Sequence, residues 1–229
     1  MTNRVEEYDP MANTVTLFGR EVPMFAAVGG VVVGVLVIVS AFNLALVALT
    51  PHTHATIYDQ PRQLETFTLP YADGSGTFSS DEMLGKTVVY YFGFTSCPDV
   101  CPEAMFNLKR AYNALTPRQQ EQVEVVFITI DWDVDTPERI AQYVGAFHED
   151  FTGLAGDAQS IEPVMDQFNV AVFRSGEDPM APGYSITHTT SMFIVSPEGR
   201  LVMRMGHTSD PNPEYMARDL RYVINGRVK

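Results

Sequence analysis

The sequence predicts an α/β domain, with a central mixed sheet and flanking helices, preceded by a single N-terminal transmembrane helix. Three observations support this. An uncharged apolar segment of helical length lies near the N-terminus. Beyond it, two continuous apolar runs rich in β-branched and aromatic residues are each followed by a segment with apolar residues every three or four positions. Two further apolar runs, separated by a turn sequence, precede a last helical pattern.

The first segment, residues 24–49, contains no charged residue, and only Ser40 and Asn43 have clearly polar side chains. About 20 apolar residues in a helix cross a bilayer core, whereas the apolar part of a cleaved signal peptide has about 7–15. We therefore expect an uncleaved anchor. The predicted parts of the chain are a cytoplasmic tail at 1–22, a transmembrane anchor at 23–50, a polar, proline-containing tether at 51–66 and the folded domain at 67–229.

Basic residues around the anchor predict its orientation. Arg4 and Arg20 precede it, and only Arg62 lies in the 20 residues that follow. By the positive-inside rule the N-terminus is then cytoplasmic. The tail is also too acidic for a mitochondrial presequence. We expect a single-pass protein of a bacterial inner membrane, with its C-terminal domain periplasmic or extracellular, where disulfides can persist. The formal net charge of -13 argues against a nucleic-acid partner, because that binding needs a basic face.

The elements of the folded domain follow one another in a recognisable order. Strands are expected at 85–94 and 123–130, each composed like a strand buried on both faces. Helices are expected at 102–116, around 140–147 and, in shorter form, at 161–168. Strands within 190–196 and 201–206 flank the turn "PEGR" and predict an antiparallel hairpin, and a closing helix follows around 216–224. The order βαβα and then ββα is that of a thioredoxin-like domain, in which a cysteine motif follows the first central strand.

The only two cysteines occupy that place, in "TSCPDVCP" at residues 95–102. A residue before proline is disfavoured in helical geometry, and proline suits the first position of a helix. We therefore expect Cys97 in a loop and Cys101 at the N-cap of a helix opened by Pro102. There the helix dipole would favour the thiolate of Cys101.

Three roles fit this cysteine pair. A structural disulfide would close only a very small loop and constrain the unfolded chain little. A redox pair suits the fold and the compartment, although the familiar motif has two intervening residues rather than three. A metal site is also compatible, because two thiolates at a loop and a cap can converge on one soft ion.

A metal site needs further ligands, and His188 is the expected third one. It lies just before the strand that should neighbour the first central strand, in a loop expected to face the cysteines. His207 is the second choice, and Met180 could add a sulfur. The other histidines are expected to be solvated: His52, His54 and His148. Two thiolates and one imidazole suit copper as Cu(I) or Cu(II), whereas structural zinc would require a fourth ligand that is not found.

The run "DWDVDTPE" at residues 131–138 suggests other chemistry at first. A calcium loop is excluded because Thr136 stands where glycine is needed and Gln142 at the twelfth position. The nucleophile motif of haloacid-dehalogenase-type phosphatases fits in neither frame. We expect a structural role, in which Thr136 or Asp135 caps a helix opened by Pro137.

Taken together, "YYFGFTSCPDVCP", "DWDVDTPE", His188 and "VSPEGRLV" resemble the Sco (SenC) family of copper chaperones. The resemblance implies a thioredoxin-like fold and one copper per domain, Cu(I) or Cu(II), bound by Cys97, Cys101 and His188. It also implies a metallochaperone rather than an enzyme, which serves assembly of the dinuclear copper centre of cytochrome c oxidase by copper delivery or thiol reduction. The implied partners are the copper-bearing subunit of the oxidase and, as a further candidate, another copper chaperone.

Two other functions stay open at this point. One is a thiol:disulfide oxidoreductase that uses Cys97 and Cys101 as its redox disulfide, and the other is a permanently bound accessory subunit of a respiratory complex. The chain also departs from the family pattern. Thr187 replaces the Asp that often precedes the histidine and could orient its imidazole. Trp132 and Val134 replace a common Pro and Arg.

Overall fold

The computed structural model describes residues 14–17, 19–49, 53–176, 184–206 and 213–228. The chain divides into two compact units, residues 1–52 and 53–229. In the first unit a hairpin of β1 (Thr14–Leu17) and β2 (Arg20–Pro23) leads into α1 (Met24–Leu49). The hairpin lies within the predicted tail and was not expected. Helix α1 is long and apolar enough to cross a membrane, a property that an anchor shares with a signal sequence.

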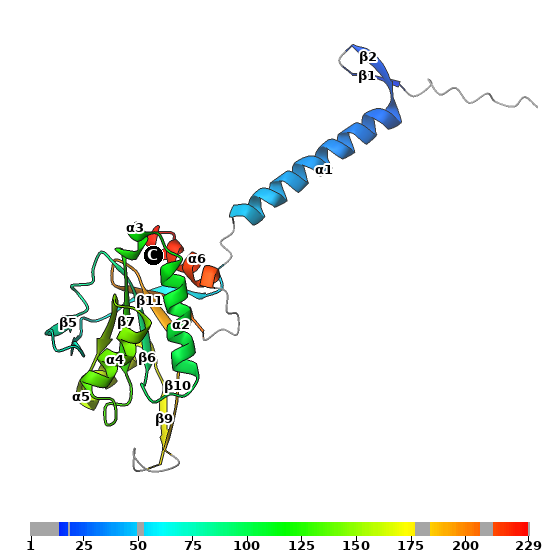
Figure 1. Ribbon diagram of the computed structural model, residues 1–229. Coiled ribbons are helices and arrows are strands. Elements are labelled where there is room, and N and C mark those ends of the chain that lie inside the picture. Colours follow the sequence, from blue (N-terminus) through cyan, green and yellow to red (C-terminus); the bar gives the residue numbers. More distant parts are fainter. Residues whose placement is uncertain (1–13, 18, 50–52, 177–183, 207–212, 229) are drawn as a thin grey trace, which may run out of the picture. The chain divides into compact units, whose positions relative to one another are not determined.

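The second unit contains a six-stranded mixed sheet in the order β3-β12-β11-β6-β7-β8 (Figure 1). Strands β6, β7 and β8 are parallel, whereas β11, β12 and β3 join by antiparallel pairing. This confirms the predicted mixed sheet and the hairpin of β11 and β12. The bounds of the strands are β3 Thr56–Gln63, β6 Thr87–Gly93, β7 Val123–Thr129, β8 Phe151–Leu154, β11 Met192–Val195 and β12 Arg200–Met205.

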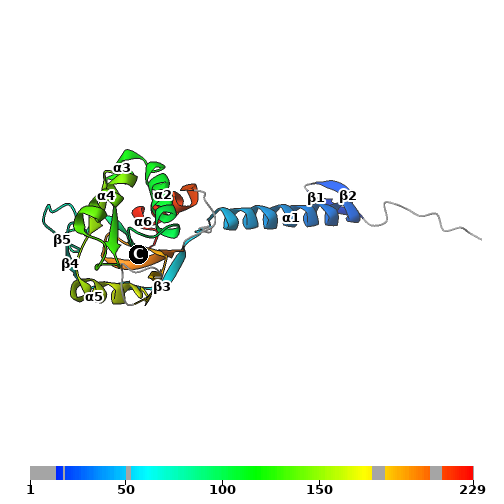
Figure 2. The same ribbon diagram turned by 60° about the horizontal axis from the view of Figure 1, so that its bottom comes forward.

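Helices cover both faces of this sheet. Helix α5 lies on the opposite side from α2 and α6 (Figure 2). Two small hairpins complete the unit, and the one formed by β9 and β10 extends beyond the end of the sheet (Figure 1). The bounds are α2 Val100–Asn113, α3 Pro117–Gln120, α4 Pro137–Phe147, α5 Ala158–Phe168, α6 Pro213–Ile224, β4 Thr68–Pro70, β5 Thr77–Ser79, β9 Val172–Ser175 and β10 Ser185–His188.

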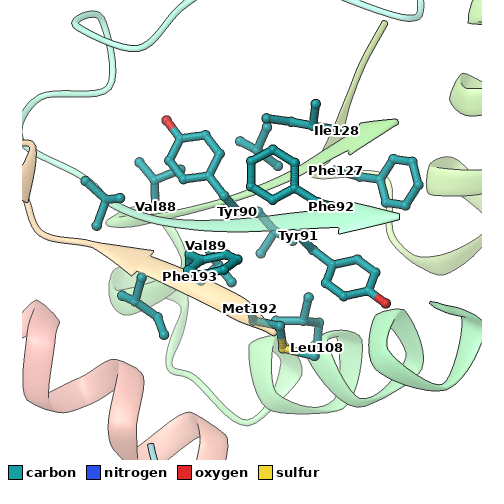
Figure 3. Close-up of a cluster of buried hydrophobic side chains, with 14 of the residues drawn as sticks. Val88, Val89, Tyr90, Tyr91, Phe92, Leu108, Phe127, Ile128, Met192 and Phe193 are labelled. Atoms are coloured by element: carbon teal, nitrogen blue, oxygen red, sulfur yellow. The ribbon is translucent and has the colours of Figure 1, made fainter. Parts of the chain in front are cut away.

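Strand β6 is at the centre of the core and is buried along its whole length. Its side chains alternate between the two layers, as strand geometry requires. Tyr90 and Phe92 lie on the side of α5, where their rings are 5.1 and 5.2 Å from that of Phe168. Tyr91 points to the other side, toward Leu108 of α2 (Figure 3). The continuous apolar run therefore forms a strand covered on both faces, as predicted.

The structure corrects the tether predicted at residues 51–66. Residues 56–63 form β3, which pairs with β12 at the edge of the sheet. The pairing is irregular: Arg62 lies opposite Leu201 and Ile57 opposite Met203, so Pro61 falls between the two paired stretches. An edge strand tolerates proline because one side of it needs no ladder hydrogen bonds. The compact unit accordingly begins at residue 53 rather than at Phe67.

Candidate metal centre

Three segments distant in sequence meet at one end of the central strands of the sheet. Strands β6 and β7 are parallel, with Gly93 opposite Thr129, so both strands end there. Strand β11 runs the other way and begins here, with Met192 opposite Tyr91. The cysteine loop after β6, the acidic loop after β7 and the segment with His188 before β11 are therefore neighbours. Sites at the carboxyl ends of parallel strands are common in open α/β sheets.

The cysteine loop enters α2 earlier than the sequence predicts. The helix begins at Val100 with Asp99 as its N-cap, so Cys101 is the second helical residue rather than the cap. Pro102 is tolerated in the first turn, where backbone N–H groups have no partner within the helix. One of these, the amide of Cys101, donates to Sγ of Cys97 at 3.4 Å. The helix start thereby holds the two cysteines together.

The thiol of Cys101 is completely buried, whereas Cys97 is only partly so. Gly93 provides the space, because a Cβ atom at that position would lie 3.2 Å from Sγ of Cys101. Burial raises the pKa of Cys101 to about 12, and the nearby hydroxyl of Tyr91 only partly opposes the shift. The expectation that the helix dipole favours the thiolate is therefore wrong for the metal-free protein, since desolvation outweighs it.

His188 is the last residue of β10, and its Nε2 atom lies 3.7 Å from Sγ of Cys101. Its Nδ1 atom is 2.9 Å from the carbonyl oxygen of Thr189. A carbonyl only accepts, so Nδ1 carries the proton and Nε2 faces the thiol with a free lone pair. Burial lowers the pKa of His188, partly offset by the Thr189 carbonyl, and the ring of Phe94 packs edge-on at 5.7 Å. The lowered pKa favours the neutral imidazole, and Nε2 is free to act as a donor atom to a metal.

The structure therefore brings all three predicted site residues to one place. The direct contact is between Cys101 and His188, and Cys97 joins them through the amide of Cys101. Within the described part of the chain, no three Cys, His, Asp or Glu side chains already form a closed metal site. The donor set itself fits copper: two sulfurs and one imidazole nitrogen are ligands that soft and borderline ions prefer.

The remaining histidines do not join this group where they are described. The ring of His54 stacks on Tyr215 at 3.8 Å, and that of His148 packs against Tyr112 at 4.9 Å. His52, the second-choice ligand His207 and Met180 lie outside the described residues.

Asp135 supports the cysteine loop, a role that the sequence analysis missed. Its buried carboxylate accepts from the amide and hydroxyl of Thr95, at 2.9 and 2.5 Å, and from the hydroxyl of Thr129 at 2.7 Å. Thr136 provides the predicted cap of α4, accepting from the amide of Arg139. One sequence signal could have indicated this role of Asp135. It is an acidic residue between a buried strand and a helix, and the neighbouring Thr136 already caps that helix.

The hairpin of β9 and β10 holds His188 in position and was also missed. Its Arg174 lies over the ring of Trp132 at 4.2 Å and donates to the carbonyl of Ile130. Next to the hairpin, Tyr184 donates to the buried carboxylate of Asp131 at 2.9 Å. The acidic loop after β7 thus contacts both the cysteine loop and the segment that supplies the imidazole.

Comparison with known proteins shows the family to which the chain belongs. The model of the SCO1/SenC family matches residues 56–225. This chain belongs to that family. An SCO2-like protein of Rickettsia felis is 32% identical over 186 residues, which cover 79% of this chain and 90% of the relative. The solution structure of apo Sco1 from Thermus thermophilus has 33% identity and a TM-score of 0.68, covering 76% of this chain and 98% of that one. Copper-bound ScoI of Bradyrhizobium japonicum has 26% identity and a TM-score of 0.62, covering 71% and 99%.

The predicted thioredoxin-like fold is thereby confirmed as that of a Sco protein. The departures from the family pattern now have structural context. In this Sco protein the carbonyl of Thr189 accepts from Nδ1 of His188, so the imidazole is oriented without a carboxylate at Thr187. Trp132, which stands where a proline is common, provides the face on which Arg174 lies.

Proposed function

We propose that this chain is a membrane-anchored copper chaperone for assembly of the dinuclear copper centre of a cytochrome c oxidase. The observation that supports it most directly is the 3.7 Å approach of Nε2 of His188 to Sγ of Cys101, with Sγ of Cys97 against the amide of Cys101. Sco proteins are a family of copper-binding proteins involved in cytochrome c oxidase assembly.

In this proposal copper is the cargo, one ion per domain, held by Cys97, Cys101 and His188. Thiolates favour Cu(I), and the imidazole allows Cu(II) as well. The thiolate is the ligand, and the pKa of the Cys101 thiol is raised by burial. Copper binding therefore releases a proton from Cys101 and weakens as the pH falls.

The anchor and the partner belong to the same proposal. Helix α1 spans a bacterial inner membrane with the N-terminus in the cytoplasm and the second unit outside it. Its length and apolar composition support this, as does the distribution of Arg4, Arg20 and Arg62. The recipient is the copper-bearing subunit of the oxidase, and another copper chaperone is the candidate donor.

Copper loading of the purified chain in detergent tests the site. We expect one copper per wild-type chain, with a sulfur-to-Cu(II) charge-transfer band, and loss of this band in His188→Ala. His148→Ala is the matched control, because His148 packs on Tyr112 away from the cysteines. An unchanged spectrum and stoichiometry in His188→Ala would refute the three-ligand site.

The exposure difference between the cysteines favours a second activity, reduction of a partner disulfide. Partly exposed Cys97 can attack the disulfide as a thiolate, forming a mixed disulfide and releasing one partner thiol. Buried Cys101 then attacks Cys97, which frees the second partner thiol and leaves a Cys97–Cys101 disulfide. A peptide with the oxidised cysteine pair of the recipient site tests this. Cys101→Ser should trap the mixed disulfide, and failure of the metal-free wild type to reduce the peptide would exclude the activity.

A further inference from the structure

A basic surface lies at the C-terminal end of this acidic chain. The net charge is -13, yet the final segment from Arg218, "RDLRYVINGRVK", contains four basic residues and one acidic residue. Several of its side chains line one surface hollow of about 200 Å³. We call these residues the basic patch: Arg218, Arg221, Tyr222, Asn225 and Arg227.

The chemistry of the basic patch is that of a surface that contacts lipid head groups. The guanidinium of Arg218 lies 5.2 Å from the ring centre of Tyr215, and that of Arg227 lies 5.5 Å from that of Tyr222. Tyrosine is enriched at the boundary between bilayer and water, and arginine keeps its charge at the surface while its stem covers apolar groups. The one acidic residue in the segment, Asp219, is buried, and it interacts electrostatically with Arg218.

Not every arginine of the patch is available. Arg221 donates from Nη2 to the carbonyl of Ala114 at 2.6 Å, and its Nη1 lies 3.7 Å from the carboxylate of Glu214. Arg221 therefore helps to hold α6 against the end of α2. Recognition of an anion depends mainly on Arg218 and Arg227, and Arg227 is the more exposed of the two.

Helix α6 is also fixed to the start of its own unit. The carboxylate of Asp219 accepts from the amides of His54 and Ala55 at 2.9 and 2.8 Å, and the ring of His54 stacks on Tyr215. Only residues 50–53 separate His54 from the end of α1 at Leu49. Each residue extends the chain by at most about 3.6 Å, so this link spans roughly 18 Å at full stretch. The link therefore limits the distance between the end of α1 and His54, the residue that contacts α6.

We propose that the basic patch docks α6 on anionic phospholipid head groups of the membrane that holds α1. This rests on the proposed anchor. Each basic residue near an anionic bilayer increases the docking equilibrium by about fivefold. Docking would restrict rotation of the domain on its short link, and so narrow the orientations in which the metal centre meets a membrane-bound partner.

Hydrogen exchange of the full chain in lipid nanodiscs tests the proposal. Discs of phosphatidylcholine alone are compared with discs that also contain phosphatidylglycerol. We expect slower amide exchange at residues 213–228 in the anionic discs, and loss of this difference at high salt. The variant Arg218→Gln/Arg227→Gln should weaken docking by about 25-fold and abolish the difference. The matched control, Arg118→Gln/Arg139→Gln, removes the same amount of charge from exposed positions in α3 and α4. This variant should retain the exchange difference between the two disc types.

The same experiment separates failure of the anchor from failure of docking. A chain that leaves the disc, with unprotected amides in α1, would overturn the anchor and this proposal together. Protected amides in α1 with equal exchange of α6 in both disc types would overturn docking alone. Docking would also be refuted if glycerol phosphate added to phosphatidylcholine discs reproduced the protection, because the patch would then bind free anions.

Discussion

Removal of the Asp135 carboxylate should disturb both the stability of the domain and its metal centre. Asp135→Ala deletes the acceptor of three hydrogen bonds and leaves the Thr129 hydroxyl and the Thr95 amide without it. A buried polar group that loses its partner costs about 1–3 kcal/mol. With two such groups we expect a loss of about 2–6 kcal/mol in the free energy of unfolding. Thr95 lies two residues before Cys97, so copper affinity should fall at least about tenfold, the effect typical of groups that support metal ligands.

The conservative variant and a neighbouring residue make this prediction specific. In Asp135→Asn one oxygen can still accept from the Thr95 amide and the Thr129 hydroxyl, so the loss should be about 1–2 kcal/mol. Asp133→Ala, at an exposed position two residues earlier, should change neither quantity. Denaturant unfolding followed by circular dichroism measures stability, and competition with a Cu(I) chelator measures affinity. The reasoning is refuted if Asp135→Ala unfolds within about 1 kcal/mol of wild type and retains its copper affinity.

Three other changes test separate parts of the structure. Gly93→Ala places a methyl group 3.2 Å from Sγ of Cys101, so we expect a loss of about 1–3 kcal/mol and weaker copper binding; thermal unfolding at the wild-type temperature would contradict this. Burial raises the pKa of Asp219 above its ordinary 3.8. The folded state therefore binds the Asp219 proton more tightly than the unfolded state does. The stabilisation from this tighter proton binding is lost as pH rises from about 3.8 through the raised pKa. Asp219→Asn should flatten that part of the curve of unfolding free energy against pH, whereas parallel curves would refute the assignment. Arg174→Ala removes the contact with Trp132 and should accelerate amide exchange in β9 and β10 but not in β6; unchanged exchange in the hairpin would exclude this contact as its support.

The proximity of the three residues of the candidate metal centre could be predicted because it follows from chain topology. Once the runs at 85–94 and 123–130 are assigned to parallel strands and the run at 190–196 to an antiparallel neighbour, their ends must meet at one end of the sheet. That places Cys97 and Cys101 opposite His188 without any knowledge of side-chain contacts. The same reasoning does not predict the role of Asp135, because that role depends on which hydroxyl and amide groups of the folded loops donate hydrogen bonds to its carboxylate.

Three hairpins (β1 with β2, β4 with β5, β9 with β10) and the strands β3 and β8 could not be predicted, because they are short or depend on pairing with distant segments. Strand β3 contains Pro61 and no alternating pattern, so local sequence favours a tether, and only pairing with β12 makes it a strand. Strands β9 and β10 have four residues each and pair only with each other. The pKa of Cys101 was predicted with the wrong sign because local sequence reveals the helix dipole but not the depth of burial that outweighs it.

The pairing of β3 with β12 has a consequence for when the domain can fold. Thr56 pairs with Arg204 and Gln63 with Arg200. Strand β3, the first of this sheet in the sequence, therefore cannot pair until β12, the last one, has been synthesised. Contacts between residues so far apart in sequence form slowly, because closing the large loop between them costs conformational entropy before the contacts can stabilise the fold. In the topology proposed above, Cys97 and Cys101 reach the oxidising side of the membrane before His188 does. The three proposed copper ligands are therefore together only late in synthesis, and under the proposed function a Cys97–Cys101 disulfide formed earlier would have to be reduced before copper could bind.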